Sequence, residues 1–218
     1  MSCAIFISSG LRSKSTRVHR WRLARSMVIA LLVMSNDARA EQARPPAEKN
    51  ANTQFMHVFG AIAPPRGYVE FCQRLPRDCE AVASSPARID LTSAKLAELD
   101  YINRTVNHEI EPATDWELYG VEDYWTYPDG RKKGDCEDYV LLKRKLLIEQ
   151  GWPQSALLIT VVLDEADARH AILTIRAAQG DFIVDNKNDS IKRWYETPYR
   201  FLMRQSTFNL QAWLSLEP

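Results

Sequence analysis

The sequence lacks several features that would have indicated a class of protein at once. It has eight glycines and 11 prolines in 218 residues, too few for a collagen-like or linker-like chain. Its 28 basic and 28 acidic residues leave no net charge, so composition gives no sign of a nucleic-acid surface. No run of about 18 apolar residues occurs, which excludes a membrane-spanning helix. What remains, with 45% hydrophobic and 26% charged residues, is typical of one globular domain.

The first 40 residues have the order of a secretory signal peptide. Six basic residues and no acidic residue occur up to Arg25, an apolar run follows over Met27–Met34, and Ala38-Arg39-Ala40 is a small-x-small cleavage pattern. The alternatives are a signal anchor or a buried helix, but eight apolar residues are too short to span a bilayer. We therefore expect export and removal of residues 1–40.

Removal of this leader changes the charge of the protein. It takes away seven of the 28 basic residues and one of the 28 acidic residues, so the mature chain has a net charge of −6. No nucleic-acid or anionic-lipid partner is expected for such a chain. Residues 41–54 are polar and contain Pro45 and Pro46, which predicts a flexible linker before a single domain over residues 55–218.

Three cysteines remain in the mature chain: Cys72, Cys79 and Cys136. Cys72 and Cys79 are seven residues apart around Pro76, and in an exported protein this spacing predicts a local disulfide, the alternative being two unpaired thiols. Zinc is not expected, because two thiolates without a nearby histidine do not complete a tetrahedral site. Cys136 is then the cysteine left over.

The hydrophobic pattern indicates an α+β fold. Residues 55–72 are predicted as loop with short extended pieces, and residues 113–134 as an aromatic-rich loop. One helix is expected from Thr92 to Pro112, and a second begins at Asp135 and stops at Gly151. The period then changes to that of strands, which are predicted at residues 156–163, 169–176, 182–185 and 199–204. This order predicts an antiparallel sheet packed against a helix.

Cys136 lies at the start of the second predicted helix, where unpaired N–H groups and the helix dipole favour a thiolate. The same N–H groups are suited to stabilise an oxyanion. The alternative for a lone cysteine is a small buried hydrophobe. The neighbouring acids Asp135, Glu137 and Asp138 oppose thiolate formation unless they point away or bind a cation.

A cysteine nucleophile needs a base, and the base needs an orienting group. His57 lies near the linker and His108 lies on a helix beside Glu109, so a surface role is expected for both. His170 begins a predicted strand, and the next strand ends in Asp185. If residues 177–180 form a four-residue loop, paired positions sum to 357, and His170 and Asp185 become diagonal neighbours on one face. The alternative is that Asp185 only begins a turn.

These residues resemble a known family, the bacterial transglutaminase-like cysteine proteinases, which include LapG-like periplasmic proteases. The resemblance covers roughly residues 55–210 and depends on Gly134–Tyr139, Gly151-Trp152-Pro153, His170–Leu173, Val184-Asp185-Asn186 and the lead-in Asp123-Tyr124-Trp125. It implies a papain-like, transglutaminase-like fold, with Cys136 as nucleophile, His170 as base and Asp185 as the orienting group. The Cys72 to Cys79 loop and a short spacer between Trp125 and Cys136 depart from the LapG pattern, which indicates a less characterised branch.

The resemblance also implies a function and partners. We expect a periplasmic cysteine endopeptidase that acts on an envelope or surface protein, with secretion beyond the outer membrane as the alternative location. Transglutaminase-type acyl transfer, cell-wall peptide amidase action, and a non-enzymatic binding module on the same scaffold stay open. Family likeness places Trp125 near the substrate cleft and suggests an inner-membrane regulator. No organic cofactor is expected.

Calcium is the one cofactor that the resemblance implies, because acids flanking the cysteine bind it in LapG-type members. Applied to this sequence, the resemblance makes Asp135 and Glu137 the calcium ligands and Asp138 a less direct candidate. The alternative is that the three acids only cap the helix and interact with its dipole. Three carboxylates do not complete a calcium shell of six to eight ligands, so carbonyls, waters or a residue such as Asp164 or Asp189 would have to contribute.

Overall fold

The structure is a computed structural model that describes residues 54–80, 87–128 and 130–218. The predicted signal peptide and almost all of the predicted linker lie outside these residues. Among the described residues, no helix has the length and apolar character needed to cross a membrane.

Within the described part of the chain, seven strands form one antiparallel sheet in the order β1-β9-β8-β4-β5-β6-β7. Their bounds are β1 Gly60–Ile62, β4 Leu157–Leu163, β5 Arg169–Ala177, β6 Gly180–Val184, β7 Lys192–Arg193, β8 Arg200–Gln205 and β9 Trp213–Ser215. The four strands predicted from the hydrophobic pattern correspond to β4, β5, β6 and β8. The short strands β1, β7 and β9 have too few residues to produce a periodic pattern.

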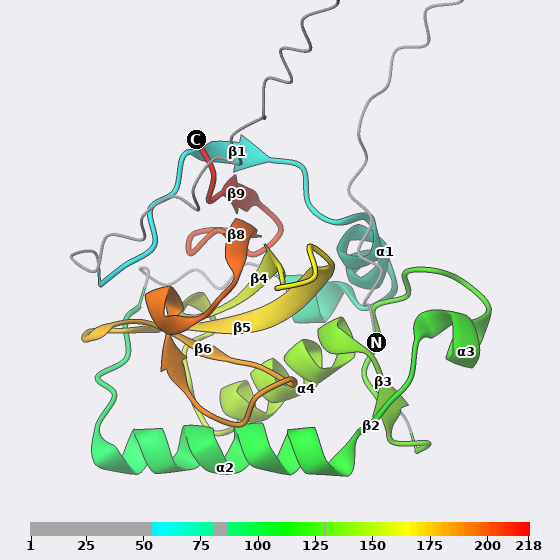
Figure 1. Cartoon of the computed structure of the whole chain (residues 1–218), viewed down its shortest axis with the longest axis horizontal. Helices are drawn as coiled ribbons and strands as arrows, with labels where there is room; N and C mark the ends of the chain where they lie inside the picture. The colour runs from blue at the N-terminus through cyan, green and yellow to red at the C-terminus, as the bar shows by residue number, and fades with distance from the viewer. Residues whose placement is uncertain (1–53, 81–86, 129) are drawn as a thin grey trace, which may run out of the picture. The chain divides into compact units, whose positions relative to one another are not determined.

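Two long helices, α2 (Ser93–Glu109) and α4 (Cys136–Glu149), lie on one side of the sheet. Figure 1 shows α4 between α2 and the sheet, and α4 contacts both β5 and α2. Thr92 caps α2 by accepting a hydrogen bond from the backbone N–H of Lys95. Gly151 follows α4 at a φ of 82°, a conformation that glycine adopts without strain. Both helices were predicted from their sequence pattern.

The central strand β4 is apolar along nearly its whole length because both of its faces are covered. Leu157, Ile159 and Val161 join the main core between the sheet and the helices. Val162 belongs to a smaller core on the other face, together with Met56, Ile172, Ile183, Tyr199 and Phe201. Burial on both faces explains why the sequence of β4 does not alternate.

Two segments predicted as loop contain helices. Helix α1 (Arg66–Arg74) begins directly after Pro64 and Pro65, so these prolines precede a helix rather than break one. The short helix α3 (Asp115–Tyr119) lies within the aromatic-rich segment and has a capping box in which Thr114 pairs with Glu117. The Thr-x-x-Glu pattern was the sequence signal for this helix. The 3₁₀ turns Pro76–Cys79, Gln154–Ala156 and Trp194–Glu196 and the parallel pair β2 (Glu111–Pro112) and β3 (Lys133–Gly134) complete the elements.

Candidate active site

Cys136 is the first residue of α4, as the sequence predicted, and it is buried against the sheet. The backbone N–H of Ala171 donates a hydrogen bond of 3.1 Å to the sulfur of Cys136. Ala171 follows His170 in β5, so this contact places the start of the helix beside the strand that carries the histidine. Asp135 occupies the N-cap position, but its side chain makes no capping hydrogen bond. Asp135 is therefore the N-cap residue that the sequence predicted, without a capping hydrogen bond from its side chain.

His170 and Asp185 are in direct contact. Nε2 of His170 lies 2.7 Å from Oδ1 of Asp185, and both side chains are buried. The register is the predicted one, because Arg176 pairs with Asp181 and Leu173 pairs with Val184. The connecting loop is shorter than expected: Ala177 already pairs with Gly180, which leaves two residues in the loop without changing the register.

The other ring nitrogen of His170, Nδ1, is buried and has no hydrogen-bond partner among the described residues. Asp185, in contrast, accepts further hydrogen bonds at both oxygens, from the Tyr199 hydroxyl at 2.5 Å and from the backbone N–H of Lys187 at 3.0 Å. Burial by itself would raise the pKa of Asp185, but the hydrogen bonds from these groups and the charge of His170 hold that pKa below its ordinary value. Asp185 is therefore suited to stay an acceptor for the histidine.

The predicted nucleophile is the reduced thiol of the mature chain. Any test of Cys136 therefore has to use the chain that begins after residue 40.

The two other histidines of the mature chain are placed away from this arrangement. The ring of His57 is exposed and contacts Phe59, with ring centroids 5.7 Å apart. His108 is exposed on α2, and its Nε2 lies 3.3 Å from Oδ2 of Asp189. The surface roles expected for both agree with their exposure.

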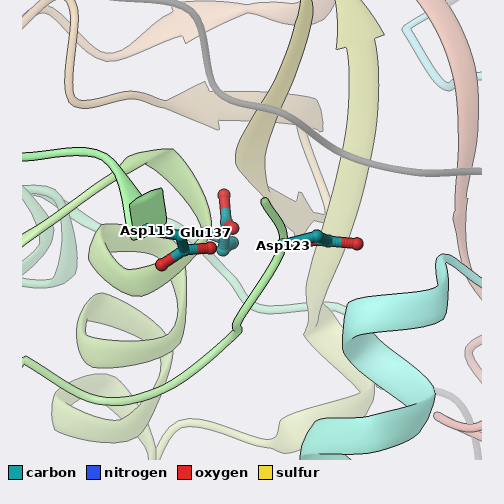
Figure 2. A group of neighbouring side chains, drawn as sticks. All are labelled: Asp115, Asp123 and Glu137. Carbon is teal, nitrogen blue, oxygen red and sulfur yellow. The ribbon is translucent and has the colours of Figure 1, made fainter. Parts of the chain in front are cut away.

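Five carboxylates gather at the start of α4, and we call them the acidic cluster: Asp115, Asp123, Asp135, Glu137 and Asp138. The carboxylate oxygens of Asp115, Asp123 and Glu137 lie within 4.8 Å of one another, and so do those of Asp115, Asp135 and Asp138. Figure 2 shows the side chains of the first group converging from α3, from the loop after it and from α4. The sequence pointed only to the three acids beside Cys136.

The acidic cluster is largely buried, and this changes its titration. Burial, with the neighbouring carboxylates, raises the pKa of Asp115 to about 7, and burial is also the main cause that raises the pKa of Asp135 to about 6. The same two causes raise the pKa of Glu137 and of Asp138 well above the ordinary range. Oε2 of Glu137 lies 3.2 Å from the sulfur of Cys136, so the acidic cluster directly adjoins the predicted nucleophile.

Asp115 and Asp123 were not predicted as site residues. Asp123 was noted only as part of the Asp123-Tyr124-Trp125 lead-in, and Asp115 begins α3. Neither residue lies at a sequence separation from Asp135 that is typical of residues binding one metal ion. The two acids suggested instead as further ligands are engaged elsewhere, since Asp164 pairs with Lys187 and Asp189 accepts from Asn107. Only the folded chain identifies the additional carboxylates.

Trp125 does not line an exposed cleft. Its side chain is fully buried, its ring meets that of Tyr68 edge-on, and its indole N–H donates to Asp123 at 2.8 Å. A Cβ on Gly67 would lie 2.4 Å from the Trp125 ring, so this glycine allows α1 to pack closely against it. The expected place of Trp125 in the substrate cleft is therefore not supported. Its position in the core holds the loop that carries Asp123.

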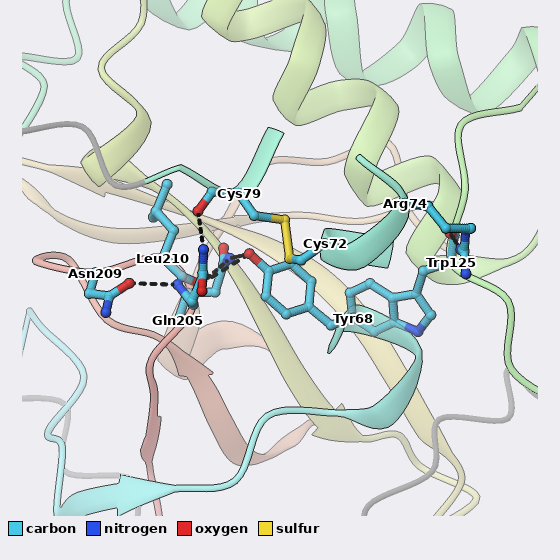
Figure 3. The surroundings of a disulfide bond; sticks show 9 residues. Tyr68, Cys72, Arg74, Cys79, Trp125, Gln205, Asn209 and Leu210 are labelled. Atoms are coloured by element: carbon cyan, nitrogen blue, oxygen red, sulfur yellow. Dashed lines mark hydrogen bonds between the residues drawn. A yellow bond between two sulfur atoms is a disulfide. The ribbon is translucent and has the colours of Figure 1, made fainter. Parts of the chain in front are cut away.

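Cys72 and Cys79 form a disulfide that links α1 to the 3₁₀ turn after it (Figure 3). Around this bond, Arg74 donates a hydrogen bond of 2.6 Å to the carbonyl of Trp125, and Gln211 donates one of 3.3 Å to the carbonyl of Cys79. The disulfide therefore stabilises a corner of the fold where α1 meets the Trp125 loop and the C-terminal segment.

A family model described as bacterial transglutaminase-like cysteine proteinase matches residues 58–218. Among solved structures, calcium-bound LapG of Legionella pneumophila is similar, with 23% identity, a TM-score of 0.48, and coverage of 67% of this chain and 87% of that chain. Another LapG structure has 24% identity and a TM-score of 0.45, covering 53% of this chain and 65% of that one. The EGTA-treated form has 24% identity and a TM-score of 0.44, with coverage of 50% and 62%. The last two matches span less than two thirds of LapG. No curated protein matches the chain.

Proposed function

The chain belongs to the bacterial transglutaminase-like cysteine proteinases and is therefore a cysteine peptidase, and on this premise we propose that it is an exported endopeptidase with the triad Cys136, His170 and Asp185. Its α+β fold, with an antiparallel sheet against helices, is the one expected for this family. A peptidase acts on a protein or peptide, and the leader sequence supports a substrate in the periplasm or at the cell surface.

Two observations carry this proposal: the contact between His170 and Asp185, and the hydrogen bond from Ala171, the residue after His170, to the sulfur of Cys136. The hydrogen bond of 2.7 Å uses Nε2 of His170, which leaves Nδ1 as the nitrogen available to a thiol. The hydrogen bond from Ala171 to the sulfur supports a position of Cys136 beside the ring. A base that is oriented by a buried carboxylate and adjoins a cysteine at a helix start is the arrangement that nucleophilic catalysis requires.

The proposed reaction has two stages. Nδ1 of His170 takes the thiol proton of Cys136, and the thiolate forms a bond to the carbonyl carbon of the substrate peptide. The first N–H groups of α4 stabilise the oxyanion. His170 then gives its proton to the departing amine as the C–N bond breaks, which leaves a thioester on Cys136. Water, deprotonated by His170, hydrolyses this thioester, so that a carboxylic acid leaves and the thiol is restored.

We also propose that the acidic cluster holds a calcium ion. Asp115 Oδ1, Asp135 Oδ1 and Asp138 Oδ2 are buried and have no hydrogen-bond partner among the described residues, which fits oxygens that face a cation. Carboxylate oxygens from Asp115, Asp123, Asp135, Glu137 and Asp138 would hold the ion, with backbone carbonyls or water completing the shell. Bound calcium would supply positive charge that offsets the carboxylates beside Cys136 and so favours its thiolate.

Two alternative enzyme functions would form the same acyl-enzyme. One differs in the molecule that receives the acyl group, and the other differs in the bond that is attacked. Transglutaminase-type transfer would use an amine in place of water, and an amidase would act on cell-wall peptide. A binding module without catalysis would not require His170 and Asp185 in contact. From family likeness we also propose a regulator at the inner membrane.

The deciding experiment adds the purified mature chain, residues 41–218, to cell envelopes and identifies released proteins by mass spectrometry. We expect released fragments with new C-termini, and none with Cys136→Ala. An added primary amine separates the alternatives, because transfer would attach it to the new C-terminus. Release by the Cys136→Ala protein at the wild-type rate would contradict the cysteine mechanism.

A further inference from the structure

Tyr199 contacts both side chains that are proposed to act with Cys136. It lies directly before β8 and is buried, with 6% of its surface exposed. Its hydroxyl donates a hydrogen bond of 2.5 Å to Oδ2 of Asp185. Its ring meets the imidazole of His170 edge-on, with centroids 5.8 Å apart and planes at 68°. Tyr199 is 14 residues beyond Asp185 and was not singled out in the sequence.

The hydroxyl completes the hydrogen bonding of the Asp185 carboxylate. Oδ1 lies 2.7 Å from His170 Nε2 and accepts from the backbone N–H of Lys187, whereas Oδ2 accepts from Tyr199. These donors come from three different segments of the chain. Rotation of the carboxylate out of this plane would break at least two hydrogen bonds, so the carboxylate is held in one orientation.

Packing alone does not explain a tyrosine at this position. Its neighbours in the small core are apolar side chains, namely Met56, Val162, Ile172, Ile183 and Phe201. A phenylalanine would fill the same space without the cost of burying a hydroxyl group. The hydroxyl is stabilised here by its bond to a carboxylate, and such charge-assisted bonds are stronger than neutral ones. Burial, and then the charge of Asp185, raise the pKa of Tyr199, so the hydroxyl stays a donor.

We propose that Tyr199 is a positioning residue of the active site, which fixes the Asp185 carboxylate and thereby the ring orientation and tautomer of His170. This inference rests on the proposed triad. The reaction needs Nδ1 of His170 free to take the thiol proton, and this requires the proton of the neutral ring to stay on Nε2. A carboxylate that is held in one plane keeps the proton there. The edge-on contact of the Tyr199 ring with the imidazole further restricts the ring orientation of His170.

The test compares two buried tyrosines that each lose only a hydroxyl. Tyr199→Phe removes the bond to Asp185. The matched control Tyr68→Phe removes a buried hydroxyl that donates to the carbonyl of Leu210 at 3.0 Å and accepts from Gln205 at 2.7 Å. Both variants are made in the mature chain with the Cys72 to Cys79 disulfide intact, and both are saturated with calcium. The two readouts are the rate of alkylation of Cys136 by iodoacetamide and the tautomer of His170.

We expect Tyr199→Phe to lower the rate of Cys136 alkylation about tenfold or more, which is the effect associated with the loss of a hydrogen bond to a charged group. Tyr68→Phe should stay within about twofold of the wild type, even if both variants melt at the same lower temperature. For the tautomer, ¹⁵N NMR is recorded in a Cys136→Ala background at a pH of about 8.5, above the ordinary histidine pKa. The wild-type ring should show Nε2–H alone, and Tyr199→Phe a mixture of both tautomers. His170→Ala identifies the signal.

A single Nε2–H tautomer together with wild-type alkylation in a folded Tyr199→Phe protein would overturn the proposal. If this variant does not fold, Tyr199→Met replaces it, because methionine adapts to irregular space in a core. Failure of both to fold would show a purely structural role and would also overturn it. The tautomer does not depend on peptidase activity. Release of envelope proteins by Cys136→Ala would therefore reject the proposed function separately from these results.

Discussion

The side chain of Asp138 lies directly against the backbone of Gly134. A Cβ on Gly134 would lie 2.6 Å from Oδ2 of Asp138 and 2.8 Å from its Cβ, closer than real carbon atoms approach. Oδ2 is the oxygen of Asp138 that has no hydrogen-bond partner among the described residues. The glycine in the cysteine motif therefore leaves room for a carboxylate of the acidic cluster.

We expect Gly134→Ala to displace Asp138 and to weaken calcium binding by about tenfold or more, as loss of one well-placed ligand would cost at least 1.4 kcal/mol. Isothermal titration of the calcium-free mature chain measures this. Gly130→Ala is the matched control, because a Cβ at Gly130 would meet nothing within 4 Å. Equal calcium affinity of the two variants would exclude Asp138 from the site.

The two acids found only in the structure provide a second test of the calcium site. Asp115→Asn and Asp123→Asn each remove a negative charge from the acidic cluster, so each should lower calcium affinity and reduce the gain in melting temperature on adding calcium. Asp167→Asn changes an exposed aspartate outside the cluster and should leave both unchanged. Melting curves in EGTA, then with calcium or magnesium restored, make the comparison. Identical curves throughout would leave these acids only a structural role.

Loss of the Cys72 to Cys79 disulfide should destabilise the mature chain by about 2.5 kcal/mol, the chain-entropy value for so short a loop. The double variant Cys72→Ala and Cys79→Ala tests this by urea unfolding. Non-reducing peptide mapping of the wild-type protein should find these two cysteines linked and Cys136 open to alkylation. A bond from Cys136 to either of them would contradict both the disulfide assignment and the nucleophile.

Lys143 gives a prediction about pH. It lies on α4 with 1% of its surface exposed, and its ammonium group has no hydrogen-bond partner among the described residues. Burial lowers its pKa to about 7, although the charges of Asp185 and Asp189 oppose this. In the unfolded chain the lysine pKa is about 10.4. Between these values the unfolded chain binds the proton more, so this lysine makes the free energy of unfolding rise with pH.

We therefore expect Lys143→Met to be more stable than the wild type near neutral pH, with an advantage that shrinks by about 1 kcal/mol per pH unit from roughly pH 7 to pH 9. Urea unfolding at several pH values measures the difference. Lys145→Met, at an exposed position of the same helix, should differ from the wild type by a constant amount. An advantage of Lys143→Met that does not change with pH would show that the buried lysine has no lowered pKa.

Some of the site followed from local sequence alone. A cysteine at a helix start is recognised from the acids of the first turn and the glycines at either end, because capping depends on a few neighbouring residues. The contact between His170 and Asp185 was predictable because a short hairpin loop leaves few choices of register, and the period of two then assigns each side chain to a face. The loop length itself was wrong by two residues, without consequence for the pairing.

Other parts depended on contacts between segments that are distant in the chain. Asp115 and Asp123 join the acidic cluster because α3 and the loop after it lie against the start of α4, and Tyr199 reaches Asp185 because β8 and β6 belong to one sheet. No pattern of neighbouring residues in the sequence indicates these contacts between distant segments. The sequence by itself therefore determined the helix that presents Cys136 and the strands that bring His170 to Asp185, since both follow from short-range periodicity. Only the tertiary structure decided which carboxylates surround Cys136 and which hydroxyl holds Asp185, because the packed core brings these distant segments together.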